Sequence, residues 1–429
     1  MSRLWLLLLA AIVLVTGCAA TETDPVAGWV ERTAVPLRTS DPAAPLDDLD
    51  ALAPAVGDAE IVGLGESNHG GAELLALKHR VLRLLVERLG FRTIAWEEDW
   101  TTGRQVDAYI RGGPGDPDAL VAQLSPQWQF GEVADVLRWL RAFNAGRPDP
   151  VRFVGVDFYL TGAAGYDMVV DYVAAAAPDR LAALHADLDP LRPSTSDPYQ
   201  HIQQITSVPD LGRYVARARR VQALVDALPH RPDDPAHAQA GHDAAQLVAF
   251  YEHYSLPMNQ ALRYREEHAA ANLRWVHQQV GGKVAYWAAG PHTVNAPDLR
   301  ITGPPEPELR FPSVGSFLRG WYGPRYRSIG FTYDHGELSL GPGQTVPMGP
   351  PAADWFEHPF GATGPDRFVL DLRTPAPPPV RDWLDRPTRT RGLPDRDPAS
   401  FVDGGALGQW YDVLVHTRVV TPAHPAAAA

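Results

Sequence analysis

Acidic and histidine side chains follow four short apolar runs of this sequence. They are Glu66 and His69 after the first run, Glu97 after the second, Asp157 after the third and His292 after the fourth. If the runs are parallel strands, their carboxyl ends lie along one edge of a sheet, where functional side chains gather. Two histidines and three carboxylates in one cleft would form an acid–base centre.

Such a centre suits hydrolysis by activated water. A histidine with the ordinary pKa of about 6.5 can take a proton from water at neutral pH and return it to a leaving alcohol. A neighbouring carboxylate selects the tautomer and stabilises the imidazolium. The sequence has no G-x-S-x-G nucleophile elbow, Ser67 does not lie on one, and the sole cysteine, Cys18, lies near the N-terminus. We therefore expect direct attack by water rather than a covalent intermediate.

Each candidate residue receives an expected role. His69 would be the general base, and Glu66 and Glu97 would orient it or the water. His292 would support the oxyanion or the leaving group, and Asp157 would contact the substrate.

Ordinary structural interpretations compete with these roles. Glu66 could cap the helix that follows it, because a carboxylate is stabilised by the free N–H groups at a helix start. His69 could be a loop histidine, and Asp157 could only orient a loop. Lys78 and His79 fall in the middle of a helical pattern, where a solvated face is the favoured position.

The order of elements predicts an α/β fold, with a mostly parallel central sheet flanked by helices and an inserted helical cap. Short apolar runs alternate with helical periodicity, as in parallel sheets covered on both faces. In the helix predicted at 72–89, the buried stripe consists of Leu74, Leu77, Val81, Leu85 and Leu89. The predicted parts are a first core part at 51–162, an alanine- and arginine-rich helical cap at 163–280, and a second core part at 281–423. Two proline-rich stretches, 341–352 and 374–399, are expected to be surface loops.

The N-terminal residues are typical of a bacterial lipoprotein signal. Arg3 precedes twelve unbroken apolar residues, fewer than the roughly 20 that a spanning helix needs. The sequence VTGC that follows resembles a lipobox, which implies cleavage after residue 17 and lipidation of Cys18. We expect residues 18–50 to be a tether, and the protein to be exported and lipid-anchored to the outer face of the cell membrane. An ordinary secretory signal with an incidental cysteine is the alternative.

Composition excludes one class of partner. The chain has 429 residues, of which 45% are hydrophobic and 21% charged, which is typical of a globular protein. Its formal charge of −13 argues against a nucleic-acid partner, since binding phosphates requires a basic surface.

Six segments resemble, in order, blocks of the erythromycin esterase family over roughly residues 50–423. The segments are GLGESNHGGAELLALKHRVLRLLVERLGFRTIAWE, EVADVLRWLRAFNAG, VRFVGVDFY, YREEHAAANLRWV, VGSFLRGWYGPRYRSIGFTY and GQWYDVLVHTRVVTP. In the fourth segment Glu266 stands where the family has aspartate. The resemblance implies an α/β core with a helical cap over a deep cleft, a small-molecule ester or lactone as substrate, and no organic cofactor.

The resemblance also assigns residues. Glu66, His69, Glu97 and His292 fall on the family's active-site positions, and His69 matches the base proposed for attack of water on a macrolactone carbonyl. Lys78 occupies a position where some members place a basic side chain, usually arginine, which implies a substrate-binding role. The sequence departs from the family pattern W-A-H-N-x-H, because it reads WAAGPH at 287–292. If the two replaced residues contact the substrate, specificity has changed; if they assist catalysis, activity has changed.

Two other functions are compatible with the same residues. Histidines and carboxylates could hold a divalent metal ion for a metal-dependent hydrolase, although the sequence has no H-E-x-x-H helix. The replaced pair at 289–290 and the lipid tether would also fit a non-catalytic surface protein that binds a ligand.

Overall fold

The computed structural model describes residues 24–303, 307–394 and 397–427. The predicted signal peptide, the lipobox and Cys18 lie outside these residues.

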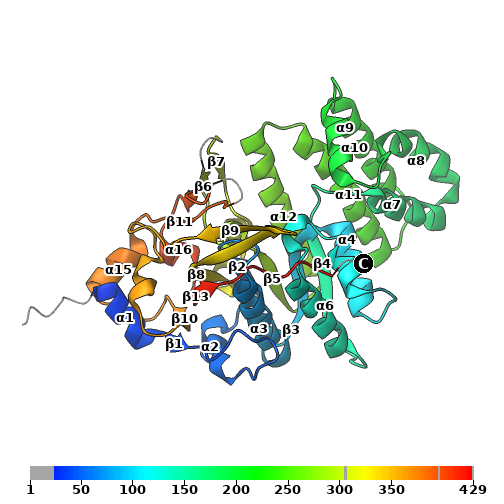
Figure 1. The fold of residues 1–429 in the computed structure, drawn as a ribbon. Coiled ribbons are helices and arrows are strands. Elements are labelled where there is room, and N and C mark those ends of the chain that lie inside the picture. Colours follow the sequence, from blue (N-terminus) through cyan, green and yellow to red (C-terminus); the bar gives the residue numbers. More distant parts are fainter. Residues whose placement is uncertain (1–23, 304–306, 395–396, 428–429) are drawn as a thin grey trace, which may run out of the picture.

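A nine-stranded, mostly parallel sheet forms the centre of the molecule (Figure 1). Its strands are β1 (Val35–Pro36), β2 (Ile61–Glu66), β3 (Phe91–Asp99), β4 (Arg152–Asp157), β5 (Lys283–Ala289), β8 (Tyr326–Gly341), β9 (Gln344–Met348), β10 (Arg367–Asp371) and β13 (Val413–Val420). The order is β1-β10-β13-β8-β2-β5-β3-β4, with β9 paired to β8. Strands β13, β8, β2, β5, β3 and β4 run parallel to their neighbours, whereas β1, β9 and β10 are antiparallel additions. The predicted fold class is confirmed.

A small antiparallel sheet, which the sequence did not predict, lies beside the main one. It contains β6 (Leu299–Thr302), β7 (Leu309–Phe311), β11 (Thr390–Arg391) and β12 (Phe401–Asp403).

Helices accompany the sheet along the whole chain. In the core they are α1 (Pro25–Thr33), α2 (Leu52–Val56), α3 (Ala72–Arg88), α4 (Trp100–Ile110), α5 (Pro117–Val121), α6 (Gly131–Asn144), α13 (Gly290–Thr293), α14 (Val314–Tyr322), α15 (Pro378–Asp385) and α16 (Leu407–Trp410). Of the predicted stripe on α3, four members are fully buried, and Leu89, just after the helix, packs partly buried against the same core.

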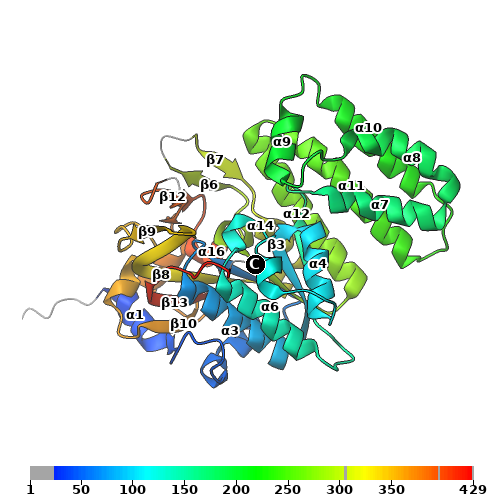
Figure 2. The same ribbon diagram turned by 45° about the vertical axis from the view of Figure 1, so that its right-hand side comes forward.

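The predicted cap region is built of helices, shown in green in Figures 1 and 2, to one side of the sheet. These are α7 (Ala163–Ala176), α8 (Leu181–Leu188), α9 (Pro198–Thr206), α10 (Gly212–Asp226), α11 (Pro235–Tyr254) and α12 (Met258–Val280). Helices α7–α11 share a hydrophobic cluster that is separate from the core clusters. The last helix, α12, returns to the core and packs its inner face against it.

The tether prediction is wrong for residues 24–50. Helix α1 buries Val26, Trp29 and Val30 in a hydrophobic cluster with the C-terminal part of the chain. Further along, Leu46 and Leu49 join the cluster around α3. This segment therefore belongs to the folded core.

The loop predictions are also partly wrong. Strand β9 lies within 341–352, where its pairing with β8 forms a hairpin. Helix α15 and strand β11 interrupt 374–399. The prolines are accommodated because they stand at helix starts or outside central strands, where no N–H is required of them.

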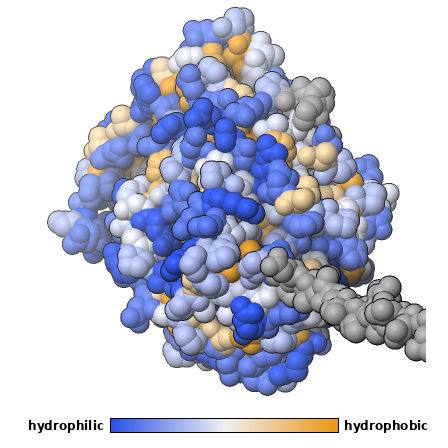
Figure 3. All heavy atoms as spheres, turned by 90° about the vertical axis from the view of Figure 1, so that its left-hand side faces the viewer, coloured by the Kyte–Doolittle hydropathy of each residue, from blue (hydrophilic) through white to orange (hydrophobic). Residues whose placement is uncertain are grey.

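The face that lies on the left in Figure 1 is mostly hydrophilic, with hydrophobic residues scattered among polar ones (Figure 3). Such scattering is ordinary for a protein surface. Within the described ranges, none of the helices combines the length and the apolar character needed to cross a membrane.

Candidate active site

The carboxyl ends of four neighbouring strands bring the predicted residues to one edge of the sheet. In the order β2-β5-β3-β4, the strand ends carry Glu66, Ala289, Glu97 and Asp157. His292 lies three residues beyond β5, in the short helix α13. The contacts described below bring these distant segments together at this edge of the sheet.

His69 and Glu66 form one pair of this site. The Nδ1 of His69 lies 2.8 Å from Oε1 of Glu66, which is fully buried. An ionised carboxylate only accepts hydrogen bonds, so Nδ1 carries the proton and Nε2 is the basic nitrogen. The His69 side chain is 32% exposed and packs edge-on against Trp128, with ring centroids 4.7 Å apart. This is the arrangement that a general base requires.

Lys78 contacts the second oxygen of the Glu66 carboxylate. Its Nζ contacts Oε2 of Glu66 and donates to the carbonyl oxygen of Ala288 at 3.2 Å. The ammonium also lies 4.2 Å from the ring centroid of Trp287. Burial lowers the pKa of Lys78 to about 8, although Glu66 opposes this shift. We refer to Lys78, Glu66 and His69 as the relay.

Two structural interpretations are overturned here. Glu66 does not cap α3, whose N-cap is Gly71 and has no side-chain hydrogen bond. Lys78 and His79 are not on a solvated face, because both are buried. The outer side of α3 is covered by α6, where Trp139 packs on His79, and by the segment that contains Asp48, which pairs with Arg80 at 2.6 Å.

His292 is held between two carboxylates. Its Nε2 lies 3.1 Å from Glu97 and its Nδ1 lies 2.7 Å from Glu266. Burial alone would lower the pKa of His292, but Glu266 and Glu97 raise it to about 10. His292 is therefore a buried imidazolium, and both of its N–H groups donate to protein groups.

Arg265 joins Glu97 to Asp157. Its guanidinium lies 3.1 Å from Glu97 and 2.6 Å from Asp157. Burial would raise the pKa of Glu97, but His292 and Arg265 hold it well below its usual range. For Asp157, burial outweighs the attraction of Arg265 and raises the pKa. We refer to Glu97, Asp157, Arg265, Glu266 and His292 as the buried ion cluster.

Arg265 and Glu266 were not among the predicted site residues. The sequence did carry a signal for them, because both lie in the segment YREEH that resembles a family block. Two adjacent charges on α12, of which Glu266 pairs with His292 and Arg265 with Glu97 and Asp157, could have been chosen on that basis.

Strand β5 connects the relay to the ion cluster. The backbone N–H of Ala289 donates to Oε2 of Glu97 at 2.9 Å, one residue after the carbonyl that accepts from Lys78. A Cβ on Gly290 would lie 2.8 Å from the hydroxyl of Tyr411 and 3.0 Å from the backbone oxygen of Glu66. The glycine in WAAGPH thus fits a close approach that a larger side chain would disturb.

The loop that carries His69 is fixed from several sides. The Asn68 amide donates to the carbonyl of Gly392 at 2.7 Å and accepts from the hydroxyl of Tyr333 at 2.8 Å. Gly70 has a φ of 79°, and a Cβ there would lie 2.0 Å from the backbone oxygen of Ser339. The glycine is required for this tight exit from the sheet.

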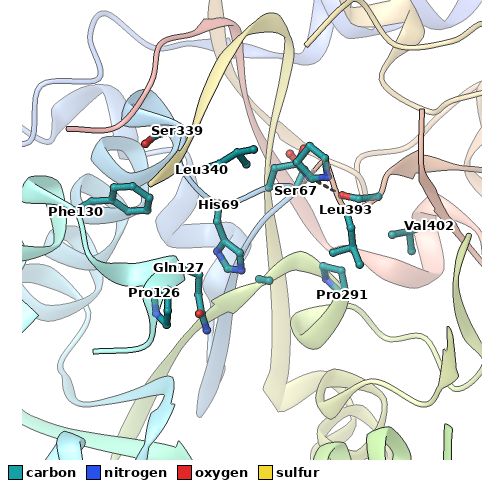
Figure 4. Close-up of a pocket in the computed structure, with 14 residues that line it drawn as sticks. Ser67, His69, Pro126, Gln127, Phe130, Pro291, Ser339, Leu340, Leu393 and Val402 are labelled. Carbon is teal, nitrogen blue, oxygen red and sulfur yellow. Dashed lines mark hydrogen bonds between the residues drawn. The ribbon is translucent and has the colours of Figure 1, made fainter. Parts of the chain in front are cut away.

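His69 opens on a cavity of about 370 Å³ (Figure 4). The lining residues are Ser67, Asn68, His69, Pro126, Gln127, Phe130, Ala289, Pro291, Ser339, Leu340, Gly392, Leu393, Pro394 and Val402. The volume is within the usual range for a small-molecule site, and the mixture of apolar walls with a few polar groups is typical of one. Of the predicted site residues, His69 lines this cavity, whereas Lys78 and Asp157 lie beneath it in ion pairs with Glu66 and Arg265.

The carboxylates and histidines are arranged around cations of the chain itself. Within the described part of the chain, no group of three or more His, Cys, Asp or Glu side chains is placed to hold a metal ion.

The ion cluster predicts how stability depends on pH. Because folding raises the pKa of His292 from 6.5 to about 10, its contribution is complete below pH 6.5 and is lost as the pH rises towards 10. The lowered pKa of Glu97 acts oppositely, since its contribution is lost as the pH falls below 4.5 towards the folded value. Denaturant unfolding of wild type and His292→Gln should therefore differ most near pH 6.5, by on the order of 5 kcal/mol, and converge near pH 10. A constant difference over this range would contradict the assignment of a buried imidazolium.

Comparison with known proteins identifies the same family by two routes, a family model and a curated relative. The model of a family described as erythromycin esterase matches residues 86–420. Among curated proteins, the erythromycin esterase type II of Escherichia coli is 31% identical over 134 residues, which are 31% of this chain and 32% of that protein. The chain thus spans about a third of the length of this relative.

Two solved structures extend the likeness over nearly the whole chain. A protein from Bacillus cereus has a TM-score of 0.82 at 26% identity, covering 95% of this chain and 99% of its own. A histidine-to-asparagine mutant of the erythromycin esterase EreC, in its open conformation, has a TM-score of 0.72 at 17% identity, covering 92% of this chain and 100% of its own. The second likeness is one of fold.

Proposed function

Since the chain belongs to the erythromycin esterase family, we propose that it hydrolyses a carboxylic ester or a lactone with water activated by His69. The observation that carries this proposal is the relay, in which a buried lysine and glutamate present an imidazole to a cavity.

The chemistry follows from the relay. Nε2 of His69 takes a proton from a water molecule, whose oxygen bonds to the ester carbonyl carbon. Glu66 stabilises the imidazolium that results, as a carboxylate does in other hydrolytic sites. The C–O bond to the alcohol then breaks, and the proton on Nε2 passes to the leaving oxygen. The products are a carboxylic acid and an alcohol, which for a lactone are parts of one opened chain.

His292 receives a different role from the one first expected. Both of its N–H groups are already donated to carboxylates, so in this arrangement it has none to offer an oxyanion. We assign it to the ion cluster that orients Glu97 and, through the N–H of Ala289, the end of β5.

We also propose that the protein is lipid-anchored to the outer face of the cell membrane. The VTGC motif supports lipidation at Cys18 and a position on the outer face of the cell membrane, where the enzyme would meet exported or environmental esters. Labelling of the full chain with a radioactive fatty acid, lost in Cys18→Ser, would test it.

A panel of substrates tests the activity. Purified wild type is incubated with phenyl acetate, aliphatic lactones and macrolactones, and acid release is measured by titration at constant pH. Turnover of at least one member is expected, with no effect of chelators. Loss of turnover on chelation would favour a metal-dependent hydrolase, and saturable binding without turnover would favour a ligand-binding protein.

A further inference from the structure

Ester hydrolysis in this cavity needs a donor for the negative charge that develops on the carbonyl oxygen. In enzymes this donor is a preorganised N–H or O–H group, and its removal costs about 10²–10³ in kcat. The relay supplies the base but no such donor, because Lys78 is sealed beneath Glu66.

Most polar groups around the cavity are already engaged. The Asn68 amide donates to Gly392, and the Ser339 hydroxyl lies 3.4 Å from the carbonyl of Gly341. The Ser67 hydroxyl makes no hydrogen bond to the described residues, but its oxygen is buried and so is not open to a ligand. The N–H of Ala289 is taken by Glu97.

Gln127 differs from these groups. It lines the cavity and is partly exposed, and its side-chain amide makes no hydrogen bond to any residue that the structure describes. In Figure 4 it is drawn directly beneath His69. An unengaged amide in the same cavity as the basic imidazole is suited to receive a carbonyl oxygen.

The backbone at Gln127 is also well anchored. The next residue, Trp128, is fully buried and donates its indole N–H to the carbonyl of Glu97 at 2.8 Å. The same indole packs against the ring of His69. Trp128 thus fixes the position of Gln127 relative to the base, which reduces the cost of organising the site during reaction.

We propose that the side-chain amide of Gln127 donates a hydrogen bond to the carbonyl oxygen of the ester and to the oxyanion that forms from it. The proposal rests on the hydrolytic function proposed above. As water adds through His69, the carbonyl π electrons move to this oxygen, where Nε2–H of Gln127 stabilises them. These electrons form the carbonyl double bond again when the alcohol leaves.

The kinetic test compares Gln127→Ala and Gln127→Glu with wild type on phenyl acetate or the best ester of the panel. Both variants should lose about 10²–10³ in kcat with little change in KM, because the interaction strengthens in the transition state. Gln127→Glu should also shift the acidic limb of the kcat/KM profile, on which activity rises as His69 loses its proton, to higher pH, since a carboxylate in the same cavity stabilises the imidazolium. Gln123→Ala, an exposed change in the same segment, is the matched control and should leave both constants unchanged. Variants of Gln127 within twofold of wild type would overturn the assignment.

A binding test separates this inference from the proposed function. Calorimetric titration uses phenyl methylphosphonate, a stable tetrahedral anion, and Gln127→Ala should weaken its binding tenfold or more. Gln127-dependent binding without any ester turnover would remove the proposed hydrolysis and leave the oxygen-binding site. Turnover with unchanged phosphonate binding in Gln127→Ala would remove the inference alone, and absence of both turnover and binding in wild type would remove both.

Discussion

Replacement of His69 by alanine should lower kcat on the best ester by about 10³–10⁴, with KM changed much less. General base catalysis contributes about 10²–10⁴ in enzymes, and the relay has no other basic atom that faces the cavity. The side chain is one-third exposed, so its removal should leave the melting temperature within a few degrees of wild type. Added imidazole should restore part of the lost rate by occupying the space of the missing ring. The measurements are steady-state kinetics with and without imidazole, and thermal unfolding.

A matched control exists in the cap. His185 makes the same contact, Nδ1 to a carboxylate at 2.8 Å with Asp189, but on an exposed helix end away from the cavity. His185→Ala should keep full activity. Undiminished turnover in His69→Ala would end the proposed mechanism, whatever the control shows.

Glu97→Ala should destabilise the protein by about 3–5 kcal/mol, the largest stability effect that we expect from one change at the site. The carboxylate accepts from His292, Arg265 and the N–H of Ala289, and its loss leaves these buried donors unpaired. Glu97→Gln should cost less, because the amide oxygen can still accept one of the bonds. Urea unfolding with an unchanged m-value would measure the difference in the free energy of unfolding.

Glu87→Ala provides the comparison for this change. Glu87 pairs with Arg83 at 2.8 Å on the surface end of α3, where such pairs contribute about 1 kcal/mol or less. If Glu97→Ala were no more destabilising than Glu87→Ala, the ion cluster would not be a structural unit.

The convergence of the site could be predicted from the sequence because it depends on one rule. Glu66, Glu97 and Asp157 each follow an apolar run, and parallel strands place such positions along one edge. The partners of these residues could not be predicted in the same way. Whether His292 donates to a substrate or to Glu266 depends on the approach of α12, which is set by packing and leaves no periodic pattern.

The burial of Lys78 and His79 has two origins, because Lys78 faces the sheet, where it contacts Glu66 and the carbonyl of Ala288, and His79 is covered by Trp139 of α6. An amphipathic helix is expected to expose its polar face to solvent. This expectation holds only if no other segment of the chain covers that face. Here the segment around Asp48 lies over α3 and buries Arg80. The sequence predicts a tether at 18–50 and therefore predicts no cover for this side of the helix.

The position of β2 in the sheet has a consequence for biosynthesis. Its two neighbours are β5 and β8, which follow it by more than two hundred residues. While the polypeptide is being made, the apolar run that forms the central strand has no partner until the entire cap has emerged. Long-range pairing of this kind slows folding and leaves aggregation-prone edges in the meantime. The chain should therefore depend on chaperones, and fragments that stop before β5 should be insoluble.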